Sequence, residues 1–65
     1  MTWEELVDKA IEMGYEDYFD FMGMKAIWNI KGLSFHSTGR VCYGFILFAE
    51  NRTYEQMYQI MEALR

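Results

Sequence analysis

The first residues of the chain carry apolar side chains at helical spacing. In TWEELVDKAIEM, residues 2–13, these side chains return every three or four positions and form one face. Thr2 followed by Glu5 is a capping box, in which each side chain satisfies a free backbone N–H at a helix start. Gly14 is suited to end the helix in a left-handed conformation. We therefore expect a helix over residues 2–13.

The end of the chain repeats this pattern. Apolar side chains in YEQMYQIMEALR, residues 54–65, form a second stripe at helical spacing. Thr53 lies just before this stripe, and with Gln56 it forms another capping box. A second helix is therefore expected from residue 54 to the C-terminus.

The region between the helices is rich in aromatic and β-branched residues and is interrupted by isolated glycines. Such sequence favours strands, with turns at the glycines. Gly32 has an alternative interpretation as a bulge inside one longer strand. The strands are expected near residues 18–22, 26–30, 33–37 and 40–48.

One hairpin can be assigned a register from its turn residues, FHSTGRVC at 35–42. A two-residue loop would need a positive φ at Thr38, which a β-branched residue resists. A three-residue loop over 37–39 needs a positive φ only at Gly39, and we adopt it. This register pairs Phe35 with Val41 and Leu33 with Tyr43.

These elements predict a single α+β domain over residues 1–65 in the order α-β-β-β(-β)-α. Its antiparallel sheet has a helix at each end of the chain, and each helix has one apolar face. Both helices are therefore expected on the same side of the sheet. That side would carry Leu33, Phe35, Val41, Tyr43, Phe45 and Leu47.

The segment RVCYGFILFA, residues 40–49, is apolar on both faces if it forms one strand. The helices can cover only one of these faces. Soluble monomers rarely expose a large contiguous apolar patch, so we expect a protein partner or a second copy on the other face. The alternative is that residues 15–21 fold over it. The expected contact residues on this outer face are Trp28, Cys42, Ile46 and Phe48.

Cysteine and histidine each occur once in the 65 residues, as Cys42 and His36. An intramolecular disulfide is therefore impossible, and a zinc site built from these residue types is disfavoured. The predicted register places Cys42 opposite Ser34 and diagonal to His36. Diagonal neighbours lie about 7 Å apart, beyond the ~3 Å that a nucleophile and its base require. We expect no catalytic, metal or cofactor site, and a Cys-dependent enzyme is the weakest hypothesis.

Negative charge is concentrated near the N-terminus of a chain whose net charge is −4. An acidic surface disfavours direct nucleic-acid binding, which relies on Lys and Arg, and it suits a larger, basic protein partner. The acidic residues after the first helix lack the spacing of a calcium loop. The expected partner-binding acids are a helical column, Glu4, Asp8 and Glu12, and a following cluster, Glu16, Asp17 and Asp20.

The segment AENRTYEQMYQIMEAL, residues 49–64, resembles the ending of small uncharacterised proteins from phages and prophages of Gram-positive bacteria. The resemblance brings no functional motif and therefore no site residue. It implies a context in which small acidic proteins bind and block a host protein, including the nucleases of bacterial defence systems.

Together these features predict a non-enzymatic, acidic protein-interaction module that forms a homodimer and acts as an inhibitor of a host protein. The alternative is a homo-oligomeric structural or accessory subunit. A lone cysteine and the lack of an apparent signal segment lead us to expect a cytoplasmic protein. No apolar run is long enough to cross a bilayer.

Overall fold

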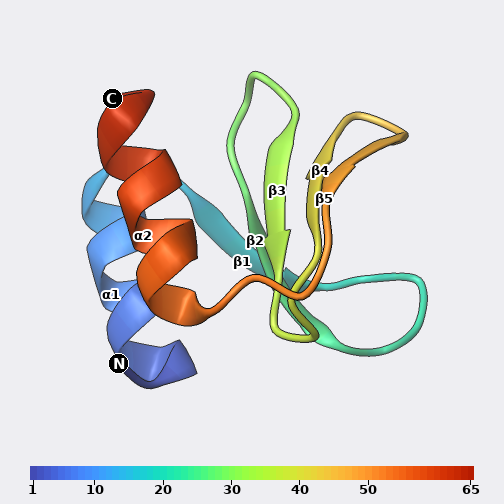
Figure 1. The fold of residues 1–65 in the computed structure, drawn as a ribbon, viewed down its shortest axis with the longest axis horizontal. Coiled ribbons are helices and arrows are strands. Elements are labelled where there is room, and N and C mark those ends of the chain that lie inside the picture. The colour runs from blue at the N-terminus through green and yellow to red at the C-terminus, as the bar shows by residue number, and fades with distance from the viewer.

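The protein is an α+β domain in which two helices cover one face of a five-stranded antiparallel sheet, as the computed structural model of residues 1–65 shows. The strands follow one another in chain order across the sheet. The helices lie side by side on the left of Figure 1, and the sheet lies to their right. This confirms the predicted fold class and the shared helix face. The elements are α1 (Trp3–Glu12), β1 (Glu16–Phe19), β2 (Lys25–Trp28), β3 (Leu33–His36), β4 (Val41–Tyr43), β5 (Ile46–Ala49) and α2 (Tyr54–Ala63).

Both helices begin at the predicted capping boxes. The Glu5 N–H donates to Thr2 Oγ1 at 3.1 Å, and the Thr2 N–H donates to Glu5 Oε1 at 2.8 Å. Thr53 and Gln56 make the same reciprocal pair at the start of α2. Gly14 follows α1 with a φ of +94°, the predicted left-handed conformation. Local side-chain chemistry therefore fixes where each helix starts.

The core lies between the helices and the inner face of the sheet. Phe35 on the central strand is fully buried, and Ile27 and Val41 lie beside it on the neighbouring strands. Leu6 from α1 and Met57 from α2 are also fully buried in this cluster. Because both helices share one apolar cluster, neither can detach without exposing the sheet face.

The hairpin between β3 and β4 has the predicted register and loop. Phe35 pairs with Val41, and the His36 N–H donates to the Arg40 carbonyl at 2.9 Å. Gly39 has a φ of +104°, and an added Cβ there would lie 3.3 Å from the backbone nitrogen of Arg52. The Arg52 N–H in turn donates to the Gly39 carbonyl at 2.9 Å. This turn therefore also supports the chain that leads into α2.

The predicted single strand over 40–48 is wrong, because the chain reverses within it. Tyr43 pairs with Ile46, so Gly44 and Phe45 form a two-residue hairpin loop between β4 and β5. Gly44 has a φ of +61°, and glycine at the first loop position is typical of a type II′ turn. The reversal moves Phe45 to the tip of the hairpin, away from the helices.

Other strand boundaries shift toward the N-terminus. The strand predicted over 18–22 is β1, which starts at Glu16 and ends at Phe19, and the next strand ends at Trp28. Gly32 lies in the turn between β2 and β3 and is not a bulge. The turn over residues 20–24 extends away from the helices at the lower right of Figure 1. These shifts free residues 20–24 to reach the outer face of the sheet.

Candidate functional site

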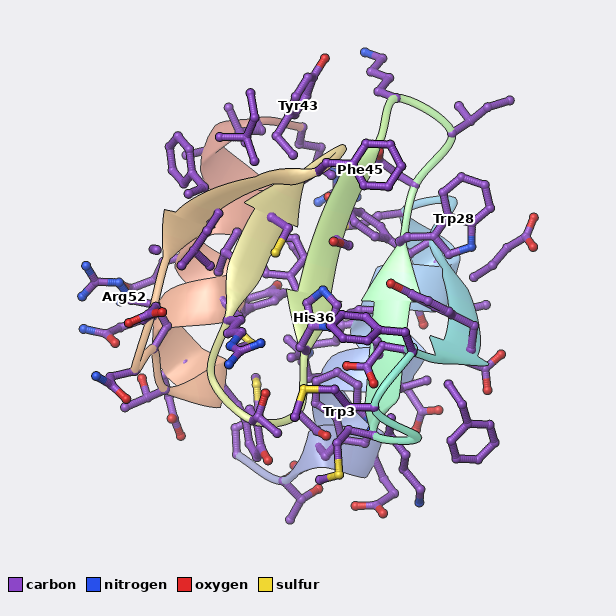
Figure 2. The ribbon with its side chains drawn as sticks, turned by 90° about the vertical axis from the view of Figure 1, so that its right-hand side faces the viewer. Trp3, Trp28, His36, Tyr43, Phe45 and Arg52 are labelled. Atoms are coloured by element: carbon purple, nitrogen blue, oxygen red, sulfur yellow. The ribbon has the colours of Figure 1, made fainter.

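Three polar side chains form a hydrogen-bonded relay on the outer face of the sheet. His36 Nε2 lies 3.1 Å from Ser34 Oγ, and His36 Nδ1 lies 2.9 Å from Asp20 Oδ2. Ser34 and His36 are two residues apart on β3, so their side chains leave the same face. All three are largely buried, with side-chain exposures of 11% for His36 and 6% for Asp20. His36 lies at the centre of this face in Figure 2.

Asp20 is the anchor of the relay. Its Oδ1 accepts the backbone N–H groups of Met22 at 2.9 Å and Met24 at 3.0 Å, while Oδ2 faces His36. The hydrogen bond with His36 lowers the pKa of the Asp20 carboxyl, the two N–H groups lower it further, and burial acts in the opposite direction. Asp20 was predicted to belong to an exposed acidic cluster. This placement is wrong because the carboxylate is largely buried and is hydrogen-bonded to His36.

The ionised state of Asp20 sets the proton positions in the relay. A carboxylate only accepts hydrogen bonds, so His36 Nδ1 must carry the proton that it donates to Asp20. In the neutral imidazole, Nε2 is then an acceptor, and the Ser34 hydroxyl donates to it. The same hydroxyl lies 3.5 Å from the Cys42 carbonyl, a longer contact. With a neutral imidazole, the relay is therefore ordered from Ser34 through His36 to Asp20.

Cys42 lies opposite Ser34, as the register predicts, and is half-buried. Both nitrogens of His36 are bonded to other side chains. The structure therefore contains no Cys–His pair, and the hydroxyl of Ser34 occupies the position that the thiol would need.

A groove of about 380 Å³ lies over the relay. Ser34, His36 and Cys42 are among its lining residues, and Arg40 is its one basic side chain. The Tyr18 ring meets the imidazole edge-on with the ring centres 6.4 Å apart. Burial raises the pKa of the Tyr18 phenol, against an opposing contribution from Ser34. The apolar lining residues of the groove are Tyr18, Phe21, Phe45 and Leu47.

A second feature of this end of the molecule is a group of exposed apolar side chains on the β4–β5 hairpin. Phe45 at the tip is fully exposed at 109%, and the others are between 48% and 69% exposed. Figure 2 shows Tyr43 and Phe45 projecting at the free end of the sheet. We call this group the hairpin surface: Tyr43, Phe45, Ile46, Leu47 and Phe48.

The structure changes the predicted outer-face patch. Trp28 and Cys42 do lie on the outer face, in the cross-strand row that also contains Ser34 and Leu47. Ile46 does not, because it pairs with Tyr43 and so leaves the opposite face from Leu47. The register shifts between β4 and β5, which leaves Phe48 as the extra residue of a bulge.

The reversal at Gly44 also changes which residues of the segment face the helices. That side was predicted to carry Tyr43, Phe45 and Leu47. Tyr43 does leave the predicted side, because it pairs with Leu33, but it is 55% exposed. Phe45 lies in the loop. Leu47 lies on the outer face. The placements of Phe45 and Leu47 are wrong because the prediction continued one strand through the turn.

Only part of the predicted acidic surface is contiguous. Glu4 and Asp8 of α1 line a groove of about 360 Å³ with Asp17 of β1, and Lys25 lies at the same groove. Glu12 is exposed one turn further along α1. Glu16 leaves the other face of β1 from Asp17 and pairs with Trp28. Of the three acids in the predicted cluster, only Asp17 therefore lies at the same groove as Glu4 and Asp8.

The relay itself was missed by sequence reasoning, although part of its signal was present. Ser34 and His36 at an interval of two on a strand were correctly placed on the outer face. Asp20 is 16 residues before His36, and only the turn over residues 20–24 brings it there. No local pattern contains that information.

Comparisons with protein-family models, curated proteins and solved structures found no match. The chain has no group of three or more His, Cys, Asp and Glu side chains placed to hold a metal ion. Neither helix has the length and apolar character needed to cross a membrane.

Proposed function

We propose that the protein is an interaction module that binds a protein partner through the hairpin surface. The observation that carries this proposal is the exposure of five consecutive or near-consecutive apolar side chains on one short hairpin. Large exposed apolar surface on a soluble monomer commonly marks an interaction site. Here it covers both faces of the hairpin, with Tyr43 and Ile46 on one face and Leu47 on the other. Aromatic residues are also enriched at protein interfaces.

The geometry of the hairpin supports this role. Phe45 lies in the loop, 109% exposed, and therefore adds little to the core. The two-residue loop and the pairing of Tyr43 with Ile46 hold the hairpin in one register. A preformed hairpin presents its apolar side chains with little loss of entropy on binding.

The acidic groove favours a partner that is basic. Glu4, Asp8 and Asp17 line a groove at the β1 edge of the sheet, and the β4–β5 hairpin lies at the other edge, so a partner that contacts both must span the sheet. Such charges accelerate association and are screened by salt. Together with the resemblance to phage proteins, this supports an inhibitor of a basic host protein, such as a defence nuclease, as the specific form of the proposal.

A capture experiment with matched variants tests the proposal. Immobilised wild type and Phe45→Glu are incubated with lysate of a Gram-positive host, with Ile11→Glu as the control. Ile11 is a half-exposed apolar residue on α1, away from the hairpin. We expect a protein that is captured by wild type and by Ile11→Glu but lost with Phe45→Glu. Equal capture by all three would contradict the proposal.

A homo-oligomeric subunit is a second candidate, favoured by the edges of the sheet. Edge strands expose unpaired backbone groups, and charged residues commonly prevent their association. The edge strand β1 contains Glu16 and Asp17, whereas β5 at the other edge contains no charged residue. Edge pairing of β5 with a second copy would double the 7.8 kDa mass in sedimentation equilibrium. A constant monomer mass up to high concentration would eliminate this candidate.

A further inference from the structure

We propose that Ser34 is a nucleophile, activated by His36 and oriented through Asp20, that accepts an acyl group from an apolar ester bound in the outer-face groove. This inference stands independently of the proposed function, because it uses the relay and not the hairpin surface as a whole.

The order of donors and acceptors carries the inference. A serine nucleophile needs its hydroxyl proton directed at a base, and the base needs its other nitrogen held by an acceptor. Here Ser34 Oγ lies 3.1 Å from His36 Nε2, and His36 Nδ1 lies 2.9 Å from Asp20 Oδ2. Such an arrangement is recognised by geometry and roles, not by the order of its residues in the chain.

The relay is held more rigidly than a chance surface contact. Asp20 receives two backbone N–H bonds in addition to the imidazole, which fixes its carboxylate. Ser34 and His36 lie on the central strand of the sheet, so their backbones are held on both sides. Asp20 acts only through His36, and it is a positioning residue.

The groove supplies a place for the acyl group. Phe21, Phe45 and Leu47 line the same groove as Ser34, so an ester with an alkyl acyl chain is the matching substrate class. Two side chains of the same groove, Tyr18 and Arg40, carry N–H or O–H donors. They are the groups that can donate to the carbonyl oxygen as it becomes negative.

The proposed step balances without a further reactant. Ser34 Oγ bonds to the carbonyl carbon of the ester, and its proton passes to His36 Nε2. The carbon–oxygen bond to the alcohol then breaks, and the alcohol leaves with that proton. An acyl ester on Ser34 remains, while Asp20 stays ionised and stabilises the transient imidazolium.

An alkyl fluorophosphonate tests the nucleophile directly, because Ser34 Oγ would bond to phosphorus as fluoride leaves. We expect one adduct by intact mass, and peptide mapping of the wild type should place it on Ser34. Ser37→Ala removes the only other serine of the chain. This variant should label at the wild-type rate, whereas Ser34→Ala should not label.

Asp20→Asn tests the positioning role in a protein that retains the nucleophile. An amide at this position donates to Nδ1 and moves the imidazole proton to Nε2, so the Ser34 proton loses its acceptor. We expect labelling at least about 10²-fold slower, the scale of lost general-base catalysis. Imidazole ¹⁵N shifts should report the proton on Nδ1 in wild type and on Nε2 in the variant.

Three results would overturn the inference. The first is no adduct on the wild type under conditions that label a serine hydrolase completely. The second is an adduct mapped to any residue other than Ser34. The third is an unchanged labelling rate in Asp20→Asn, with circular dichroism showing that the variant is folded.

Discussion

At the scale of single residues, Asp20 links a turn to the central strand by charge and hydrogen bonding. Its carboxylate accepts bonds from His36, Met22 and Met24 while 6% exposed. Hydrogen bonds to charged groups contribute about 1.5–3 kcal/mol each. We expect Asp20→Asn to lower the free energy of unfolding by about 2 kcal/mol at pH 7, measured by urea denaturation. An equal change in Asp17→Asn, at an exposed position, would show that the loss is general to acidic residues.

The same residue predicts a dependence of stability on pH. The pKa of Asp20 is lower in the folded protein than its ordinary value, so between the two values the unfolded chain binds more protons. The stabilisation is therefore complete above about pH 4, the ordinary value, and is lost as the pH falls through the folded pKa. The stability difference between wild type and Asp20→Asn should shrink as the pH falls below 4, measured by thermal unfolding. A difference that grows with acid would contradict this assignment.

Two glycines with positive φ should differ in their tolerance of alanine. At Gly44, with a φ of +61°, no atom lies within 4 Å of an added Cβ, so only backbone strain of about 1–2 kcal/mol is expected. At Gly39, with a φ of +104°, the Cβ would also meet backbone atoms of Asn51 and Arg52 at 3.3 Å. Gly39→Ala should therefore lower the free energy of unfolding more than Gly44→Ala does. The reverse order would contradict the described turn.

At the scale of elements, the β4–β5 hairpin divides one apolar segment into core and surface. Val41 is fully buried, whereas Phe45 is fully exposed. Val41→Ala removes two buried carbon atoms and should lower the free energy of unfolding by about 2 kcal/mol. Phe45→Glu should change it by less than about 0.5 kcal/mol. Both are measured by urea denaturation, and a large loss for Phe45→Glu would show that the hairpin surface is part of the core.

The elements that could be predicted from sequence are those specified by neighbouring residues. The capping boxes at Thr2 and Thr53 and the Gly39 turn are each encoded within a few positions, and all three are confirmed. The reversal at Gly44 was missed because its two-residue loop contains no polar residue. The apolar sequence therefore lacks the polar residues that usually indicate a turn. Asp20 was missed because its partner His36 is distant in sequence. Contacts between residues distant in sequence, unlike helix caps, are not specified by the neighbouring residues.

At the scale of the whole molecule, the acidic groove and the hairpin surface have separate expected roles. Glu4 and Asp8 lie at the groove between α1 and β1, so their charge should affect the rate of association with a basic partner. We expect Glu4→Gln with Asp8→Asn to slow association about tenfold or more at low salt, with little effect at high salt. Stopped-flow measurements over a salt series would show this. Lys9→Gln, which makes the helix more acidic, is the control and should not slow association.

The central claim is that the partner contacts the hairpin surface, and hydrogen–deuterium exchange on the isolated complex tests it most directly. The measurement compares amide exchange across residues 43–48 and across α1, with and without the captured partner. We expect residues 43–48 to gain the strongest protection. Protection confined to α1, with residues 43–48 exchanging as in the free protein, would contradict the account.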